Sequence, residues 1–66
     1  MWRYALVFPS GNTQIWALVK ENTNYRFVNE AERKIMPPVF ATIADALDLL
    51  DVLKQTKFIK EWEGIE

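Results

Sequence analysis

Three segments in the first half of the chain have the pattern of β-strands, and turn-forming residues separate them. Residues 2–8 alternate large apolar side chains with smaller or charged ones, which is the two-residue period of a strand. Residues 14–20 and 25–29 are rich in the β-branched and aromatic residues that strands favour. Residues 9–12 contain Pro, Ser, Gly and Asn, and residues 21–24 contain two Asn residues, as turns often do. The pattern therefore predicts a three-stranded antiparallel meander.

Residues 42–54 carry the long apolar pattern with the 3.6-residue period of an α-helix. Thr42 is expected to cap the helix N-terminus with its hydroxyl group, and Asp45 places a negative charge in the first turn, where the helix dipole favours one. The helix is expected to cover one face of the sheet. Its apolar stripe consists of Ile43, Ala46, Leu47, Leu50 and Leu53, with Leu49 on the flank.

The remaining segments connect these elements or close the fold. Residues 35–40 contain Pro37 and Pro38, which exclude a helix, so we expect an extended crossover from the sheet to the helix. Residues 58–63 are expected to form a short fourth strand, with a final helical turn as the alternative, because so short an apolar run does not distinguish the two. The prediction is one α+β domain over residues 1–66, in the order β-β-β-α-β: a three-stranded antiparallel meander, one helix packed on one face, and a possible short C-terminal fourth strand.

The register of the first two strands decides which side chains the helix covers. We predict a four-residue loop at residues 9–12, which pairs Phe8 with Thr13 and sets apolar residues opposite apolar ones. The covered face then carries Tyr4, Leu6, Phe8, Ile15, Ala17, Val19 and Phe27. The other face carries Arg3, Ala5, Val7, Gln14, Trp16, Leu18, Lys20, Arg26 and Val28. A sheet face in water is normally polar, so an apolar patch on this second face indicates a binding surface.

Three interpretations of this patch compete. The first is a homodimer interface with Trp16 at its centre, because Trp and Arg side chains dominate interface energies. The residues assigned to that interface are Trp16, Leu18, Val7, Ala5, Val28, Arg3 and Arg26. In the second, the C-terminal segment folds over the patch and brings Ile59 and Trp62 to Trp16. In the third, single-stranded nucleic acid stacks on Trp16 between the basic residues Arg3, Lys20 and Arg26.

Composition limits the classes of function that we expect. The chain has no Cys and no His, so the commonest thiol nucleophile, the commonest general base and the thiolate ligands of zinc are absent. We therefore expect no enzyme activity, no cofactor and no metal site, and we interpret Asp45, Asp48 and Asp51 on one helix face as a solvated surface. The net charge of −1 lacks the basic field of a duplex-DNA binder.

No apolar run has the length of a membrane-spanning helix, and the absence of disulfides favours the cytoplasm. These observations together predict a small interaction or regulatory module that acts by contact through an apolar sheet face. Its expected partner is a second copy of itself or another protein. The alternative is a weak binder of single-stranded nucleic acid.

Overall fold

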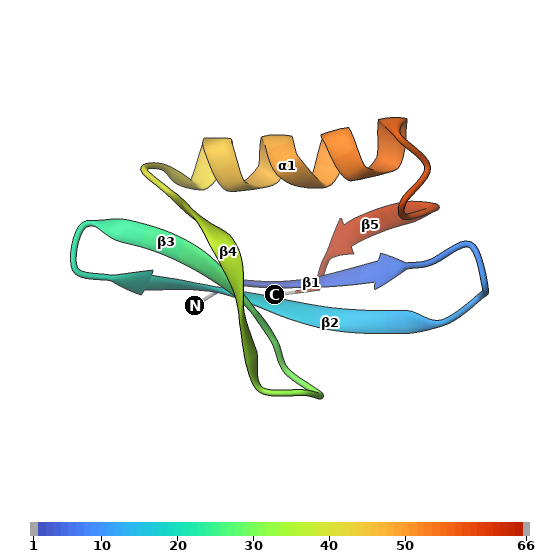
Figure 1. Cartoon of the computed structure of the whole chain (residues 1–66), viewed down its shortest axis with the longest axis horizontal. Coiled ribbons are helices and arrows are strands. Elements are labelled where there is room, and N and C mark those ends of the chain that lie inside the picture. The colour runs from blue at the N-terminus through green and yellow to red at the C-terminus, as the bar shows by residue number, and fades with distance from the viewer. Residues whose placement is uncertain (1, 66) are drawn as a thin grey trace.

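The computed structural model describes residues 2–65, which form one antiparallel sheet covered on one face by a single helix (Figure 1). The elements in chain order are β1 (Trp2–Val7), β2 (Thr13–Glu21), β3 (Asn24–Asn29), β4 (Lys34–Phe40), α1 (Ile43–Gln55) and β5 (Glu61–Gly64). The strand order across the sheet is β4-β3-β2-β1-β5, and every neighbouring pair is antiparallel. Helix α1 therefore connects one edge of the sheet to the other across its face.

The α+β class, the antiparallel sheet and the helix on one face are confirmed, but the predicted number of strands is too low. Residues 35–40, predicted as a crossover, belong to β4, which pairs with β3 at the sheet edge. An edge strand needs backbone donors on one side only, so it accepts Pro37 and Pro38, which are joined by a cis peptide bond. The register of β3 and β4 shifts between Tyr25 and Phe27, opposite these prolines. The strand predicted over residues 58–63 is confirmed only in its second half: β5 spans Glu61–Gly64 and pairs with β1, and residues 58–60 are not part of a strand.

The hairpin between β1 and β2 has a three-residue loop, so the predicted register is wrong by one residue. The N–H of Gly11 donates to the carbonyl of Phe8 at 2.8 Å, and the N–H of Phe8 donates to the carbonyl of Asn12 at 2.8 Å. Gly11 has φ of +93°, the left-handed conformation that ends a three-residue hairpin loop. Val7 therefore pairs with Thr13, where the prediction paired Phe8 with it.

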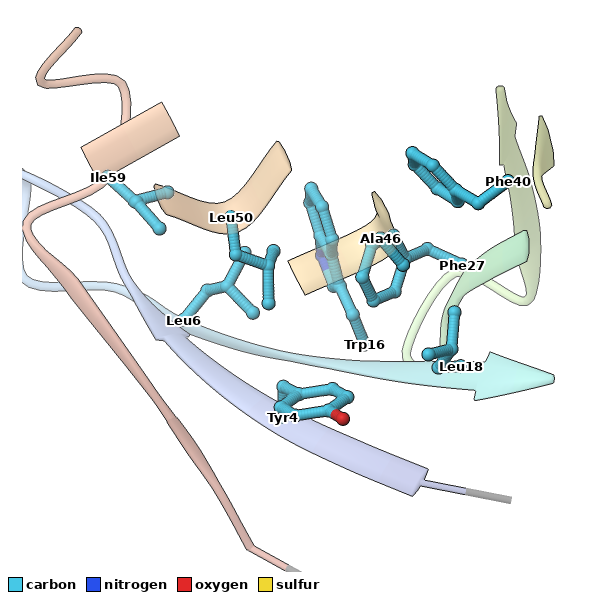
Figure 2. Close-up of a cluster of buried hydrophobic side chains, with 9 residues drawn as sticks. All are labelled: Tyr4, Leu6, Trp16, Leu18, Phe27, Phe40, Ala46, Leu50 and Ile59. Carbon is cyan, nitrogen blue, oxygen red and sulfur yellow. The ribbon is translucent and has the colours of Figure 1, made fainter. Parts of the chain in front are cut away.

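This one-residue difference exchanges the two faces of β2. Trp16 pairs with Tyr4 and Leu18 pairs with Phe27, so both side chains lie on the face that α1 covers. Figure 2 shows the ring of Trp16 rising from β2 toward the helix, among the other core side chains. The buried core consists of Tyr4, Leu6, Trp16, Leu18, Phe27, Phe40, Ala46, Leu50 and Ile59. The placement of Ile15, Ala17 and Val19 under the helix is accordingly corrected, and these residues lie on the opposite face.

The helix follows its predicted pattern closely. The hydroxyl oxygen of Thr42 accepts a hydrogen bond from the N–H of Asp45 at 3.1 Å, which confirms the N-cap. Ala46 and Leu50 are buried, and the other residues of the stripe pack against the core from its margin. In the described residues no helix has both the length and the apolar character that crossing a membrane requires.

Candidate functional site

The sheet face opposite α1 has no covering element within residues 2–65 (Figure 1). The register and the alternation of side chains along each strand assign its members. They are Arg3, Ala5 and Val7 from β1, Thr13, Ile15, Ala17, Val19 and Glu21 from β2, Asn24, Arg26 and Val28 from β3, Ile35 from β4, and Glu61 and Glu63 from β5. We call this surface the open face.

Five of the seven predicted interface residues lie on the open face, and two do not. The five are Arg3, Ala5, Val7, Arg26 and Val28. Trp16 and Leu18 are 4% and 0% exposed in the core, so their assignment to an uncovered interface is corrected. Ile15, Ala17 and Val19 lie on the open face instead, so their predicted position under the helix is wrong. The three-residue loop ending at Gly11 was the signal that could have corrected the register.

The C-terminal segment does not cover the open face. Ile59 is buried in the core beneath α1, and Trp62 packs against that same core on the helix side of the sheet. The rings of Trp62 and Tyr4 meet edge to face, with centroids 5.8 Å apart. The second interpretation of the patch placed this segment over it, and that placement is wrong, because β5 extends the sheet sideways from β1.

An ion pair crosses the open face from β1 to the end of β3. Arg3 donates two hydrogen bonds to the carboxylate of Glu30, from Nε to Oε2 at 2.7 Å and from one terminal nitrogen to Oε1 at 2.8 Å. The pair spans β2, where Ala17 is the Cα partner of Arg3 and its small side chain leaves room for the guanidinium group. The hydrogen bond from Arg3 holds the pKa of Glu30 below its usual value.

Aliphatic side chains lie on the open face beside this ion pair. One row across the strands contains Ile35, Val28, Ala17 and Arg3. Ile65 extends this row beyond β1, because its N–H donates to the carbonyl of Arg3 at 3.0 Å. The two isoleucines at the ends are 54% and 40% exposed, which is high for such large apolar side chains. The row therefore offers water apolar surface mainly at its two ends, whereas Ala17 in its middle is buried.

Opposite charges flank this row on different sides. Arg26 lies toward the β3 side, where a terminal nitrogen donates to Glu21 at 3.3 Å. Glu61 and Glu63 lie on β5 at the other side and are exposed, and neither forms an ion pair with another described residue. The open face thus has the Arg26–Glu21 ion pair on one side and two glutamates without an ion-pair partner among the described residues on the other.

The two edges of the sheet are poorly suited to adding a strand from another molecule. Pro37 and Pro38 remove two backbone donors from β4, and β5 is only four residues long with two glutamates. Contact through the open face needs no backbone pairing. The groups available there are aliphatic side chains and charged groups, which suit binding by burial and ion pairing.

No family model matches the chain, and neither the search of curated proteins nor that of solved structures finds a similar protein.

Proposed function

We propose that the protein works by contact, as a homodimer joined through the open face, and serves as an interaction or regulatory module. The observation that carries this proposal is the cluster of aliphatic side chains from four strands on a face without a covering element. Burial of apolar surface is the main favourable term in association, and a second protein surface would supply it. The edges of β4 and β5 oppose the alternative route of strand addition.

The charge pattern favours a second copy as the occupant. Arg26 lies on β3, one side-chain row beyond the row of Arg3 and Ala17, and Glu63 lies on β5, one row to the opposite side. The midpoint between these two charges therefore falls between Ala17 and Arg3, at the centre of the open face. A twofold axis through this point, lying between two stacked faces and perpendicular to the line that joins the two charges, sets each Arg26, which is paired with Glu21 within its own chain, against the partner's Glu63. Twofold interfaces require this kind of self-complementarity.

The nucleic-acid alternative lacks the stacking platform on which it was based. It depended on Trp16 as a stacking platform between basic residues, and the ring of Trp16 is enclosed under α1. The described open face has no aromatic side chain in its place. Its β5 side carries Glu61 and Glu63, which repel phosphate groups.

The proposal is tested by sedimentation equilibrium over a wide concentration range, with a matched pair of substitutions. Ile35→Lys places a charge on the open face, and Val52→Lys places one on the outer side of α1. The two side chains are 54% and 48% exposed, so neither substitution buries a charge in the folded monomer. We expect Ile35→Lys to weaken dimerisation about tenfold or more and Val52→Lys to leave it unchanged, because only Ile35 loses apolar burial.

Charge reversal tests the orientation of the two copies. Arg26→Glu and Glu63→Arg should each weaken the dimer, and the double variant should recover most of the lost affinity, because it restores opposite charges across the interface. A monomer at every concentration would refute the homodimer. Equal weakening by Ile35→Lys and Val52→Lys would place the contact elsewhere.

A further inference from the structure

A hollow of about 230 Å³ lies on the helix side of the sheet, apart from the open face. Its lining comes from the β1–β2 hairpin, from the β3–β4 hairpin and from Phe58 after the helix. The lining residues are Phe8, Gln14, Trp16, Asn29, Glu32, Lys34, Met36 and Phe58. The volume is below the usual range for drug-sized ligands, so the hollow fits a small molecule with one ring.

Hydrogen bonds fix the two amide side chains of this hollow in one orientation. Gln14 Oε1 accepts from Trp16 Nε1 at 3.0 Å and from Asn29 Nδ2 at 3.0 Å. Asn29 Oδ1 accepts from the backbone N–H groups of Ala31 at 3.1 Å and Glu32 at 3.3 Å. An indole N–H and a backbone N–H can only donate, so each amide must point its oxygen toward them. The two amide side chains are therefore held rigidly.

In this orientation each amide oxygen already accepts two hydrogen bonds, so the amides can offer a ligand only N–H donors. Gln14 Nε2 forms no hydrogen bond with a described residue, and among those residues no buried side-chain nitrogen or oxygen lacks a partner. Gln14 Nε2 therefore reaches solvent and can donate to a carbonyl oxygen. Glu32, which also lines the hollow, supplies the acceptor for a ligand N–H group.

The hollow also has an aromatic wall that is only partly covered. The rings of Phe8 and Phe58 meet edge to face with centroids 5.8 Å apart. Phe58 is 57% exposed, the highest value among the large apolar side chains that the structure describes as exposed. A flat ring bound against this wall would remove apolar surface from water and add an aromatic contact.

We propose that this hollow binds a small aromatic amide: a flat ring that carries a carbonyl oxygen and an adjacent N–H group. The ring lies against Phe8 and Phe58, the carbonyl accepts from Gln14 Nε2, and the N–H donates to Glu32. This site does not depend on the proposed dimer, since none of its lining residues belongs to the open face.

Benzamide is the probe, and ¹H–¹⁵N spectra of the full chain are the measurement. The side-chain amides of Gln14 and Asn29 and the indole N–H of Trp16 each give their own signal. We expect these signals to shift and saturate with a Kd on the order of 1 mM, which is reasonable for a ligand of this size. Toluene has the ring without the amide, and it should bind at least tenfold more weakly.

Two substitutions separate the polar contact from the ring contact. Gln14→Glu keeps the shape and an acceptor oxygen for Trp16 and Asn29, but replaces the free donor with an acceptor, so benzamide affinity should fall at least tenfold. Phe58→Ala removes an exposed ring that folding needs little, and it should weaken binding several-fold. Absence of saturable shifts in the wild-type chain, equal binding of toluene, or unchanged binding in both variants would overturn the proposal.

Discussion

Arg3 and Glu30 determine how the open face responds to acid. Folding lowers the pKa of Glu30, chiefly through the hydrogen bond from Arg3. A carboxyl group with a lowered folded pKa stabilises the folded state above its unfolded pKa, and this contribution is lost as the pH falls through the folded value. The contribution of this pair is therefore present at neutral pH and disappears in acid.

Glu30→Gln should lower the free energy of unfolding at pH 7, and the difference from the wild type should shrink toward zero as the pH falls below the usual range of a glutamate. Urea unfolding at pH 7, 5 and 3 measures it. Glu61→Gln is the matched control, because Glu61 forms no ion pair with a described residue, and it should change little at any pH. A deficit of Glu30→Gln that grew in acid would contradict the role assigned to the pair.

The end of α1 has the hydrogen bonds of a Schellman motif without the usual glycine. The N–H of Phe58 donates to the carbonyl of Leu53 at 2.9 Å, and the N–H of Lys57 donates to that of Lys54 at 3.1 Å. Lys57 adopts φ of +65°, a left-handed conformation in which the Cβ of an L-residue comes too close to the following carbonyl oxygen. The helix is thus stopped by a residue that is strained there.

Lys57→Gly should relieve that strain and raise the free energy of unfolding by up to about 1 kcal/mol, after allowing for the greater freedom of glycine in the unfolded chain. Lys54→Gly removes the same charge from the last turn of α1, where helical geometry favours a side chain. It should lower stability by about 1 kcal/mol. Thermal and urea unfolding of both variants check the prediction. Destabilisation by both would show that the lost lysine charge matters more than the backbone.

Elements with a clear period could be predicted from the sequence, and those without one could not. Thr42 and the apolar stripe located α1 within a residue at each end. In β2, residues 15–19 are all apolar, so either face could enter the core, and alternation could not choose between Trp16 and Ile15. The length of the hairpin loop sets the register, and this register places the larger side chains in the core. The prolines of β4 argued against a strand, because a central strand excludes proline. An edge strand accepts it, and the sequence does not show that this strand lies at the edge.

The residues of the candidate site divide in the same way: those on strands with a clear alternation could be predicted, and those that depend on the register could not. Arg3, Ala5, Val7, Arg26 and Val28 were predicted on the uncovered face because β1 and β3 alternate clearly. The Gln14–Trp16–Asn29 contacts could not be predicted, since they join β2 to β3 and depend on the register. An error of one residue in the predicted register therefore placed the wrong residues of β2 at the centre of the site.

The molecule as a whole has a small core, so its folding and its association are linked. Stabilities of about 0.05–0.15 kcal/mol per residue correspond to about 3–10 kcal/mol for a chain of 66 residues. If two copies join through the open face, the dimer adds stability that increases with protein concentration. A substitution that damages the core would then reduce the dimer as well, because it depletes the folded chains that associate.

Trp16→Ala should consequently unfold the chain instead of only separating two folded copies. Trp16 is 4% exposed, its ring contacts Phe27 at a centroid distance of 5.5 Å, and its indole N–H bonds to Gln14. Truncating a buried Trp to Ala costs about 3–5 kcal/mol, a large fraction of the roughly 3–10 kcal/mol expected for this chain. Circular dichroism and urea unfolding at two protein concentrations measure the loss.

Trp2→Ala is the matched control, because Trp2 lies at the sheet end with 37% of its surface exposed. Trp2→Ala should lower the free energy of unfolding clearly less than Trp16→Ala does, since less of the Trp2 surface leaves water on folding. A fully folded, monomeric Trp16→Ala variant with an unchanged urea midpoint would put Trp16 back on an external contact surface. That outcome would also return β2 to the four-residue hairpin loop, because only the register decides which face of β2 meets the helix.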